Sequence, residues 1–84
     1  MNSKARKTLQ AIFAVPTIKT LAWDDMEALL LALGATLTEG NGSRVKFDLE
    51  GRTIAYHRPH HPRTARAYQV EATRDFLAKL GIKP

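Results

Sequence analysis

The sequence contains no cysteine among its 84 residues. Disulfide bonds and thiolate zinc sites are therefore excluded, and the reducing cytoplasm is the expected location. No run of about 20 apolar residues occurs, so no membrane span is expected, and the basic N-terminal segment lacks the apolar run of a secretory signal. No glycine-rich phosphate loop, dinucleotide-binding motif or metal-ligand spacing occurs either, so we expect no cofactor and no metal.

Positive charge is what the sequence has in excess. Lysine and arginine total 13 residues against 8 acidic ones, which gives a formal net charge of +5. This balance favours an anionic partner, either nucleic acid, an acidic protein or a membrane surface, and does not choose among them. A chain of this length is expected to form a single domain over residues 1–84, with a small core.

Three segments show the apolar periodicity of helices, and we predict helices over residues 3–14, 23–33 and 68–80. Basic residues near the start of the first helix are either a nucleic-acid contact or a solvated face: Lys4, Arg6 and Lys7. The second helix carries acidic residues in its first turn and closes at Gly34, as helix termini favour. Trp23, at its start, is expected to be a structural anchor rather than a base-stacking platform.

Three further segments predict strands over residues 35–39, 43–49 and 52–57, joined by tight turns that contain glycine. The middle strand alternates between two sets of side chains. Its apolar set is Val45, Phe47 and Leu49, and its polar set is Arg44, Lys46 and Asp48. Tyr56 of the third strand is expected in the core. The prediction is an α+β fold of two layers, in which helices cover the apolar face of a three-stranded antiparallel sheet and the other face is basic.

All three histidines lie where the third strand ends and a proline-containing loop begins: His57, His60 and His61. Four arginines surround them in the sequence: Arg52, Arg58, Arg63 and Arg66. Histidine transfers protons near neutral pH, and arginine binds phosphate with two parallel hydrogen bonds. A metal site is not expected, because no carboxylate lies near the histidines in the sequence and their surroundings are cationic.

The order of these motifs resembles the HicA family of bacterial toxins. Four features carry the resemblance: the αβββα order, Gly42-Ser43 at the start of the middle strand, the segment His57-Arg58-Pro59-His60, and the closing Leu80-Gly81-Ile82. The resemblance covers about residues 21–82, so residues 1–20 are interpreted as an added N-terminal helix. It implies a fold similar to the double-stranded-RNA-binding domain (dsRBD), ribosome-independent cleavage of messenger RNA, and a HicB-like antitoxin protein as partner.

In the family motif the residue after Gly-Ser is commonly a catalytic histidine, but this sequence has Arg44 there. Arginine cannot act as a base at physiological pH, so Arg44 retains only phosphate binding and transition-state stabilisation. Either His57 or His60 therefore transfers the protons, or that group is lost and the domain binds RNA or a partner without cutting. We predict His57 and His60 as catalytic residues and the following as RNA-binding: Arg44, Lys46, Arg52, Arg58 and Arg63.

The leading hypothesis is thus a HicA-like, metal-independent endoribonuclease that a HicB-like antitoxin neutralises. The main alternative is a non-catalytic RNA-binding or complex-forming module on the same fold. A DNA-contacting accessory domain is compatible with the charge but lacks a helix-turn-helix signature. Arg44 and Lys46 are alternatively plain solvated residues, or partners of Asp48 and Glu50 across the turn.

Overall fold

The computed structural model describes all residues from 1 to 84. It contains three helices and three strands in the order α1 (Ser3–Ile12), α2 (Trp23–Ala32), β1 (Thr36–Glu39), β2 (Arg44–Leu49), β3 (Arg52–His57) and α3 (Ala67–Lys79). Each element confirms a segment predicted from the sequence, with ends that differ by at most two residues. The α+β class is confirmed as well. The structure contains no candidate membrane-spanning helix.

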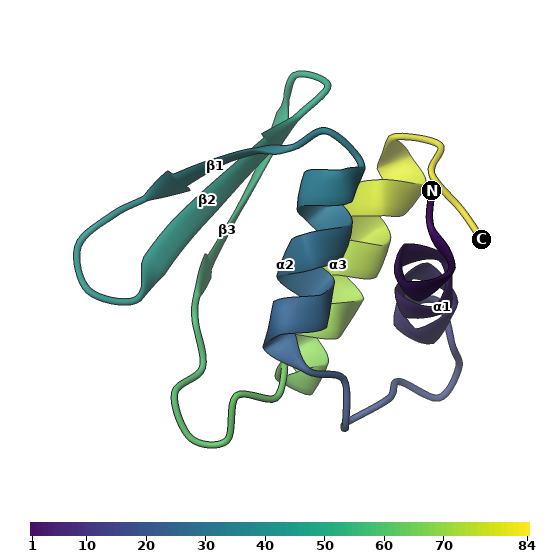
Figure 1. The fold of residues 1–84 in the computed structure, drawn as a ribbon, viewed down its shortest axis with the longest axis horizontal. Coiled ribbons are helices and arrows are strands. Elements are labelled where there is room, and N and C mark those ends of the chain that lie inside the picture. Colours follow the sequence, from purple (N-terminus) through teal and green to yellow (C-terminus); the bar gives the residue numbers. More distant parts are fainter.

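The sheet is an antiparallel meander in the order β1-β2-β3 (Figure 1). The turn between β2 and β3 is two residues long, and Glu50 and Gly51 both have positive φ, at 50° and 81°. The twist of such a turn matches that of the flanking strands. It fixes the register in which Arg44 lies opposite His57 and Val45 lies opposite Tyr56. Because side chains alternate along a strand, this register gathers the apolar residues of both strands on one face.

The two faces of the sheet differ as the alternation predicts. Val45, Phe47 and Leu49 are at most 3% exposed and face the helices, whereas Arg44 and Lys46 are exposed on the opposite side. We call that side the outer face, and its exposed residues include Thr38, Arg44, Lys46, Ala55 and His57.

All three helices lie on the other side of the sheet, and α1 packs against α2 and α3 on their side away from the strands (Figure 1). The core between sheet and helices centres on Trp23, which is fully buried. Its ring meets that of Tyr56 edge-on at a centroid distance of 4.9 Å, and Tyr56 in turn contacts Phe47 at 5.7 Å. The structure thus confirms the prediction that Trp23 is an anchor and Tyr56 a core residue.

Candidate functional site

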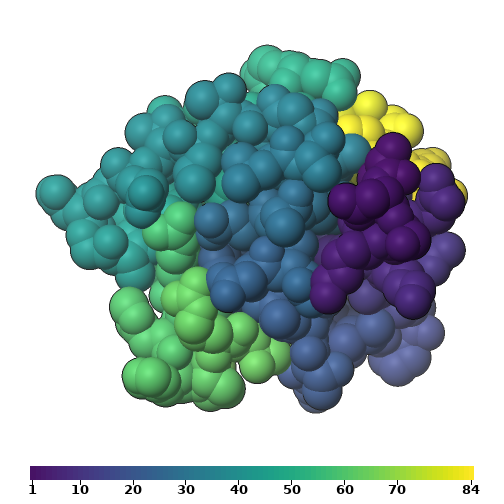
Figure 2. Space-filling view, viewed as in Figure 1, coloured from purple at the N-terminus to yellow at the C-terminus, as the bar shows by residue number.

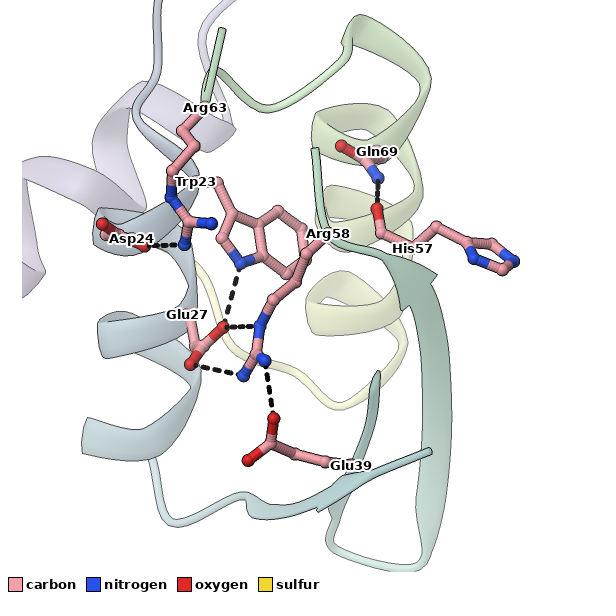
Figure 3. Close-up of polar contacts among 8 residues, drawn as sticks. All are labelled: Trp23, Asp24, Glu27, Glu39, His57, Arg58, Arg63 and Gln69. Atoms are coloured by element: carbon pink, nitrogen blue, oxygen red, sulfur yellow. Dashed lines mark hydrogen bonds and ion pairs between the residues drawn. The ribbon is translucent and has the colours of Figure 1, made fainter. Parts of the chain in front are cut away.

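The histidine loop, residues 58–66, connects β3 to α3 and projects as a lobe beside the strands and the start of α2 (Figure 2). Gln69, in the first turn of α3, is 2% exposed and holds both ends of this loop. Its Nε2 donates to the carbonyl of His57 at 2.9 Å (Figure 3), and its Oε1 accepts from the backbone N–H of Arg66 at 2.9 Å. One buried amide therefore fixes where β3 ends and where α3 begins.

The second half of the loop is held by the start of α2 and the residue Leu21 before it. Trp23 donates its backbone N–H to the carbonyl of Arg63 at 3.0 Å, and Ala65 donates to the carbonyl of Leu21 at 2.8 Å. The guanidinium of Arg63 also donates to Asp24 Oδ1 at 2.6 Å. These contacts attach the loop to the fold from both directions, so that its exposed histidines are displayed from an anchored backbone.

Arg58 turns its side chain to the helix side of the sheet (Figure 3). Its Nε and Nη2 donate to the two carboxylate oxygens of Glu27, each at 3.1 Å, and its Nη1 donates to Glu39 at 2.7 Å. Trp23 Nε1 donates to the same carboxylate at 2.9 Å. The two hydrogen bonds with Glu27, which have the larger effect, and the one with Glu39 raise the pKa of Arg58 above its ordinary value. This two-point ion pair is of the strong, geometrically specific kind, and it joins the exit of β3 to α2 and β1.

His57 precedes Arg58 and points the opposite way (Figure 3). The N–H of Arg58 donates to the carbonyl of Ser43 at 2.8 Å. The next pair along the strands, Arg44 and His57, is therefore a non-hydrogen-bonded pair, in which opposite side chains lie close together. The imidazole Nδ1 is 3.5 Å from Ser43 Oγ, which is a marginal contact. The exit of β3 thus presents an exposed imidazole beside an exposed guanidinium.

Arg44 and Lys46 have no carboxylate partner. The ion pairs of the structure involve other residues. Asp48, which lies on the same strand, instead accepts a hydrogen bond from Thr53 Oγ1. The alternative that Arg44 and Lys46 pair with Asp48 and Glu50 is therefore not found, and their charges are open to an anionic ligand.

Two hollows meet at His57. The outer hollow, of about 390 Å³, lies on the outer face, and its lining includes Arg44, Lys46 and His57. The loop hollow, of about 310 Å³, lies beside the histidine loop, and its lining includes His57, His60, His61, Arg66 and Tyr68. No aspartate or glutamate lines either hollow. An anion placed at His57 therefore meets cationic or neutral groups on both sides.

The structure brings together part of the site proposed from the sequence. His57, Arg44 and Lys46 share the outer face and line one hollow. His57 and His60 share the loop hollow. The two histidines expected to transfer protons thus line the loop hollow together, and Arg44 and Lys46 line the adjoining outer hollow.

The other three arginines proposed to bind RNA are placed differently. The side chains of Arg58 and Arg63 are engaged by carboxylates, so the geometry does not favour their prediction as RNA ligands. Arg52 pairs with Leu49 at the opposite end of β3 from His57, and the strand rise puts roughly 16 Å between the two positions. Sequence proximity placed Arg52 and Arg58 near the histidines, whereas strand length separates Arg52 from them and strand alternation turns Arg58 to the other face.

Several residues that shape the site have weak signals in the sequence. Tyr68 lies off the buried stripe of α3, where an aromatic residue is unexpected. Gln69 stands three positions after Arg66, where a side chain can accept from the backbone at a helix start. The two carboxylates that hold Arg58 have no local signal at all, since Glu27 and Glu39 are 31 and 19 residues away.

No three histidine, aspartate or glutamate side chains are placed to hold a metal ion. An αβββα core with a cationic, carboxylate-free surface at the exit of β3 defines a small α+β domain of dsRBD-like fold. The family model described as the HicA toxin of bacterial toxin-antitoxin matches residues 23–82, and the chain belongs to this family. The resemblance seen in the sequence is thereby confirmed, and α1 lies outside the matched residues. No curated protein and no solved structure matches the chain.

Proposed function

We propose that this HicA-family chain is a ribosome-independent endoribonuclease that cleaves messenger RNA in the cytoplasm without a metal ion. The observation that carries the proposal is the pairing of His57 with Arg44 across β3 and β2, at the junction of two hollows that no carboxylate lines. The imidazole of His57 and the permanently charged guanidinium of Arg44 are therefore neighbours across the two strands.

Metal-independent RNA cleavage needs a base and an acid. The base removes the proton of a 2′-hydroxyl, whose oxygen then attacks the adjacent phosphorus. The bond from phosphorus to the 5′-oxygen breaks, and the acid gives its proton to that leaving oxygen. The products are a 2′,3′-cyclic phosphate and a 5′-hydroxyl. His57 and His60 line one hollow, so we assign the two roles to them as a pair.

The cations on either side of His57 supply the second requirement. Negative charge builds on the non-bridging phosphate oxygens during the attack, and fixed donors stabilise it. Arg44 and Lys46 are available on the outer face, and Arg66 lines the loop hollow without forming an ion pair. We therefore propose Arg44, Lys46 and Arg66 as the RNA ligands nearest the cleaved bond.

A second candidate function is binding of RNA or a partner without cleavage. It is favoured by the weak support of the imidazoles, because the ring of His57 has only the 3.5 Å contact with Ser43 and no carboxylate orients it. Arg44 also occupies the position where the family motif commonly has a histidine. A cleavage assay separates the two functions.

Membership of a toxin–antitoxin family implies an antitoxin partner. We propose that this partner is a HicB-like protein that covers the outer face and the histidine loop. Because Arg44, Lys46 and Arg66 on that surface form no ion pair within the chain, an acidic surface is complementary to them. Addition of such a protein is expected to stop both RNA binding and cleavage.

Incubation of the purified chain with a long messenger RNA and a chelator tests the proposal. The wild type should cut and leave 2′,3′-cyclic phosphate ends, and His57→Ala and His60→Ala should each slow the reaction. Arg52→Ala is the matched control for Arg44→Ala, since it removes an exposed arginine from the far end of β3. Cleavage that survives loss of both histidines rejects the proton-transfer assignment. RNA binding by a wild type that never cuts supports the second function.

A further inference from the structure

Tyr68 lines the loop hollow, and the proposed proton transfer and phosphate binding do not use it. Tyr68 is 67% exposed, and it is the only exposed side chain among the chain's six phenylalanine, tyrosine and tryptophan residues. The other tyrosine, Tyr56, is 6% exposed. The ring of Tyr68 is therefore available to a ligand at the edge of the proposed site.

The ring is presented from a rigid part of the fold. Tyr68 lies in the first turn of α3, directly before Gln69, whose buried amide holds both His57 and Arg66. Its backbone position is therefore fixed relative to the backbone of His57. A tyrosine side chain has few rotatable bonds, so it provides a large contact surface at a low cost in conformational entropy.

The surroundings of the ring suit a base of a nucleic acid. The loop hollow is near the lower end of the about 300–1,000 Å³ typical of small-molecule sites, so it suits one base rather than a longer segment. Aromatic rings bind bases by stacking, and cationic neighbours hold the attached phosphates. Arg66, which is exposed and forms no ion pair, lines the same hollow and supplies such a cation.

The position of the hollow relates this base to the cleaved bond. His57 lines both the outer hollow and the loop hollow. A phosphate at His57 therefore has the loop hollow immediately beside it, within reach of the base of a neighbouring nucleotide. A base that is paired and stacked in a duplex cannot enter such a hollow, whereas an unpaired base can.

We propose that Tyr68 is a base-stacking residue, and that the loop hollow is a subsite for one unpaired base next to the phosphate bound at His57. This proposal rests on the proposed function and adds to it a preference for single-stranded RNA. Tyr68 is a specificity-determining residue in this scheme, and the proton transfers remain with the histidines.

The test measures binding separately from cleavage. A short 2′-fluoro-substituted RNA, which lacks the attacking hydroxyl, is labelled with a fluorophore and titrated with the full chain as a single strand and as a blunt duplex of the same sequence. Tyr68→Ala should weaken single-strand binding about tenfold, as expected for one lost base–aromatic stack, and should leave duplex binding within about twofold. Tyr68→Phe keeps the ring and should bind the single strand like the wild type. Leu31→Ala removes an exposed apolar side chain of α2 and is the matched control.

The outcomes distinguish this proposal from the one it rests on. If the wild type binds the single strand and Tyr68→Ala binds it equally well, the stacking subsite is rejected while RNA binding stands. Equal losses on single strand and duplex also reject it, because they indicate a general contact. If the wild type binds neither RNA, the proposed function fails and the subsite with it. An upfield shift of the Tyr68 ring protons on addition of the single strand supports stacking directly.

Discussion

The two faces of the sheet use similar side chains in opposite ways where β3 ends. His57 and Arg58 are consecutive, and strand alternation sends them to opposite faces. On the helix side, Arg58 is enclosed by two carboxylates and is 21% exposed. On the outer face, Arg44 is exposed and has no ion-pair partner. One arginine stabilises the fold and the other is available to a ligand, so formal charge alone does not reveal which cations can bind RNA.

The N-terminal half of α2 shows the same division. Its acidic residues match the helix dipole, but each also pairs with a basic residue from elsewhere in the chain: Asp24 with Arg63, Asp25 with Lys4, and Glu27 with Arg58. These pairs neutralise cations around α2 and the second half of the histidine loop. The cations of the outer face have no such acidic partners. The positive charge that is available near His57 therefore lies on that face.

The largest expected effect comes from the outer face. His57→Ala should reduce the rate of RNA cleavage by about 10²–10⁴-fold, the usual contribution of a general acid or base. The free energy of unfolding should change by less than about 0.5 kcal/mol, because an exposed side chain is removed. Cleavage kinetics and urea denaturation of the same preparation check both statements. If the variant loses stability together with activity, His57 stabilises the fold, as Arg58 does, and the loss of cleavage does not show a catalytic role.

The helix side should respond in the opposite manner. Arg58→Met keeps the length of the side chain but leaves the carboxylate of Glu27 without its main partner. We expect the free energy of unfolding to fall by about 2–3 kcal/mol, as for loss of one member of a largely buried, hydrogen-bonded pair. Urea denaturation measures the change.

Arg63→Met is the matched control for that experiment. Its pair with Asp24 is exposed on both sides, and such pairs contribute less than about 1 kcal/mol. If the two variants lose equal amounts of free energy of unfolding, burial does not distinguish the two arginines. The contrast between the faces would then depend only on the measurements at the outer face.

The fold was predictable from local patterns, and the division of the arginines was not. The alternation in β2 and the helical periodicity in α3 are patterns of residues that are close in the sequence, so the elements and the two faces of the sheet can be predicted from it. The cross-strand pairing of Arg44 with His57 follows from the two-residue turn at Glu50. The carboxylates that enclose Arg58 come from α2 and β1. Such long-range pairings depend on how the helices pack on the sheet, which no local pattern specifies.

A smaller effect distinguishes Arg44 on the outer face from Arg52, an exposed arginine that pairs with Leu49 at the other end of β3 and lies on the opposite face of the sheet. Arg44→Ala should weaken binding of single-stranded RNA about tenfold, the loss expected for one charge-assisted phosphate contact. It should also reduce the slope of log affinity against log salt by about 0.7. Arg52→Ala, at the far end of β3, should change affinity by less than about twofold. Similar losses in both variants would show that the whole length of β3 contacts RNA and that the site is not confined to the exit of the strand.

The smallest expected effect concerns an uncharged group of the helix side. Burial raises the pKa of Tyr56 to about 12, and its hydrogen bond with Thr73 lowers it in part. Because a tyrosine in the unfolded chain titrates near pH 10, the folded state holds this proton more tightly, and stability is retained below about pH 10 and falls as pH rises from about 10 to 12. Linkage gives a loss of about 1 kcal/mol in the free energy of unfolding between about pH 10 and 11. Urea denaturation at the two pH values should show this loss in the wild type and in the control variant Tyr68→Phe. Tyr56→Phe should not show it. If Tyr56→Phe shows the full loss, other groups cause it.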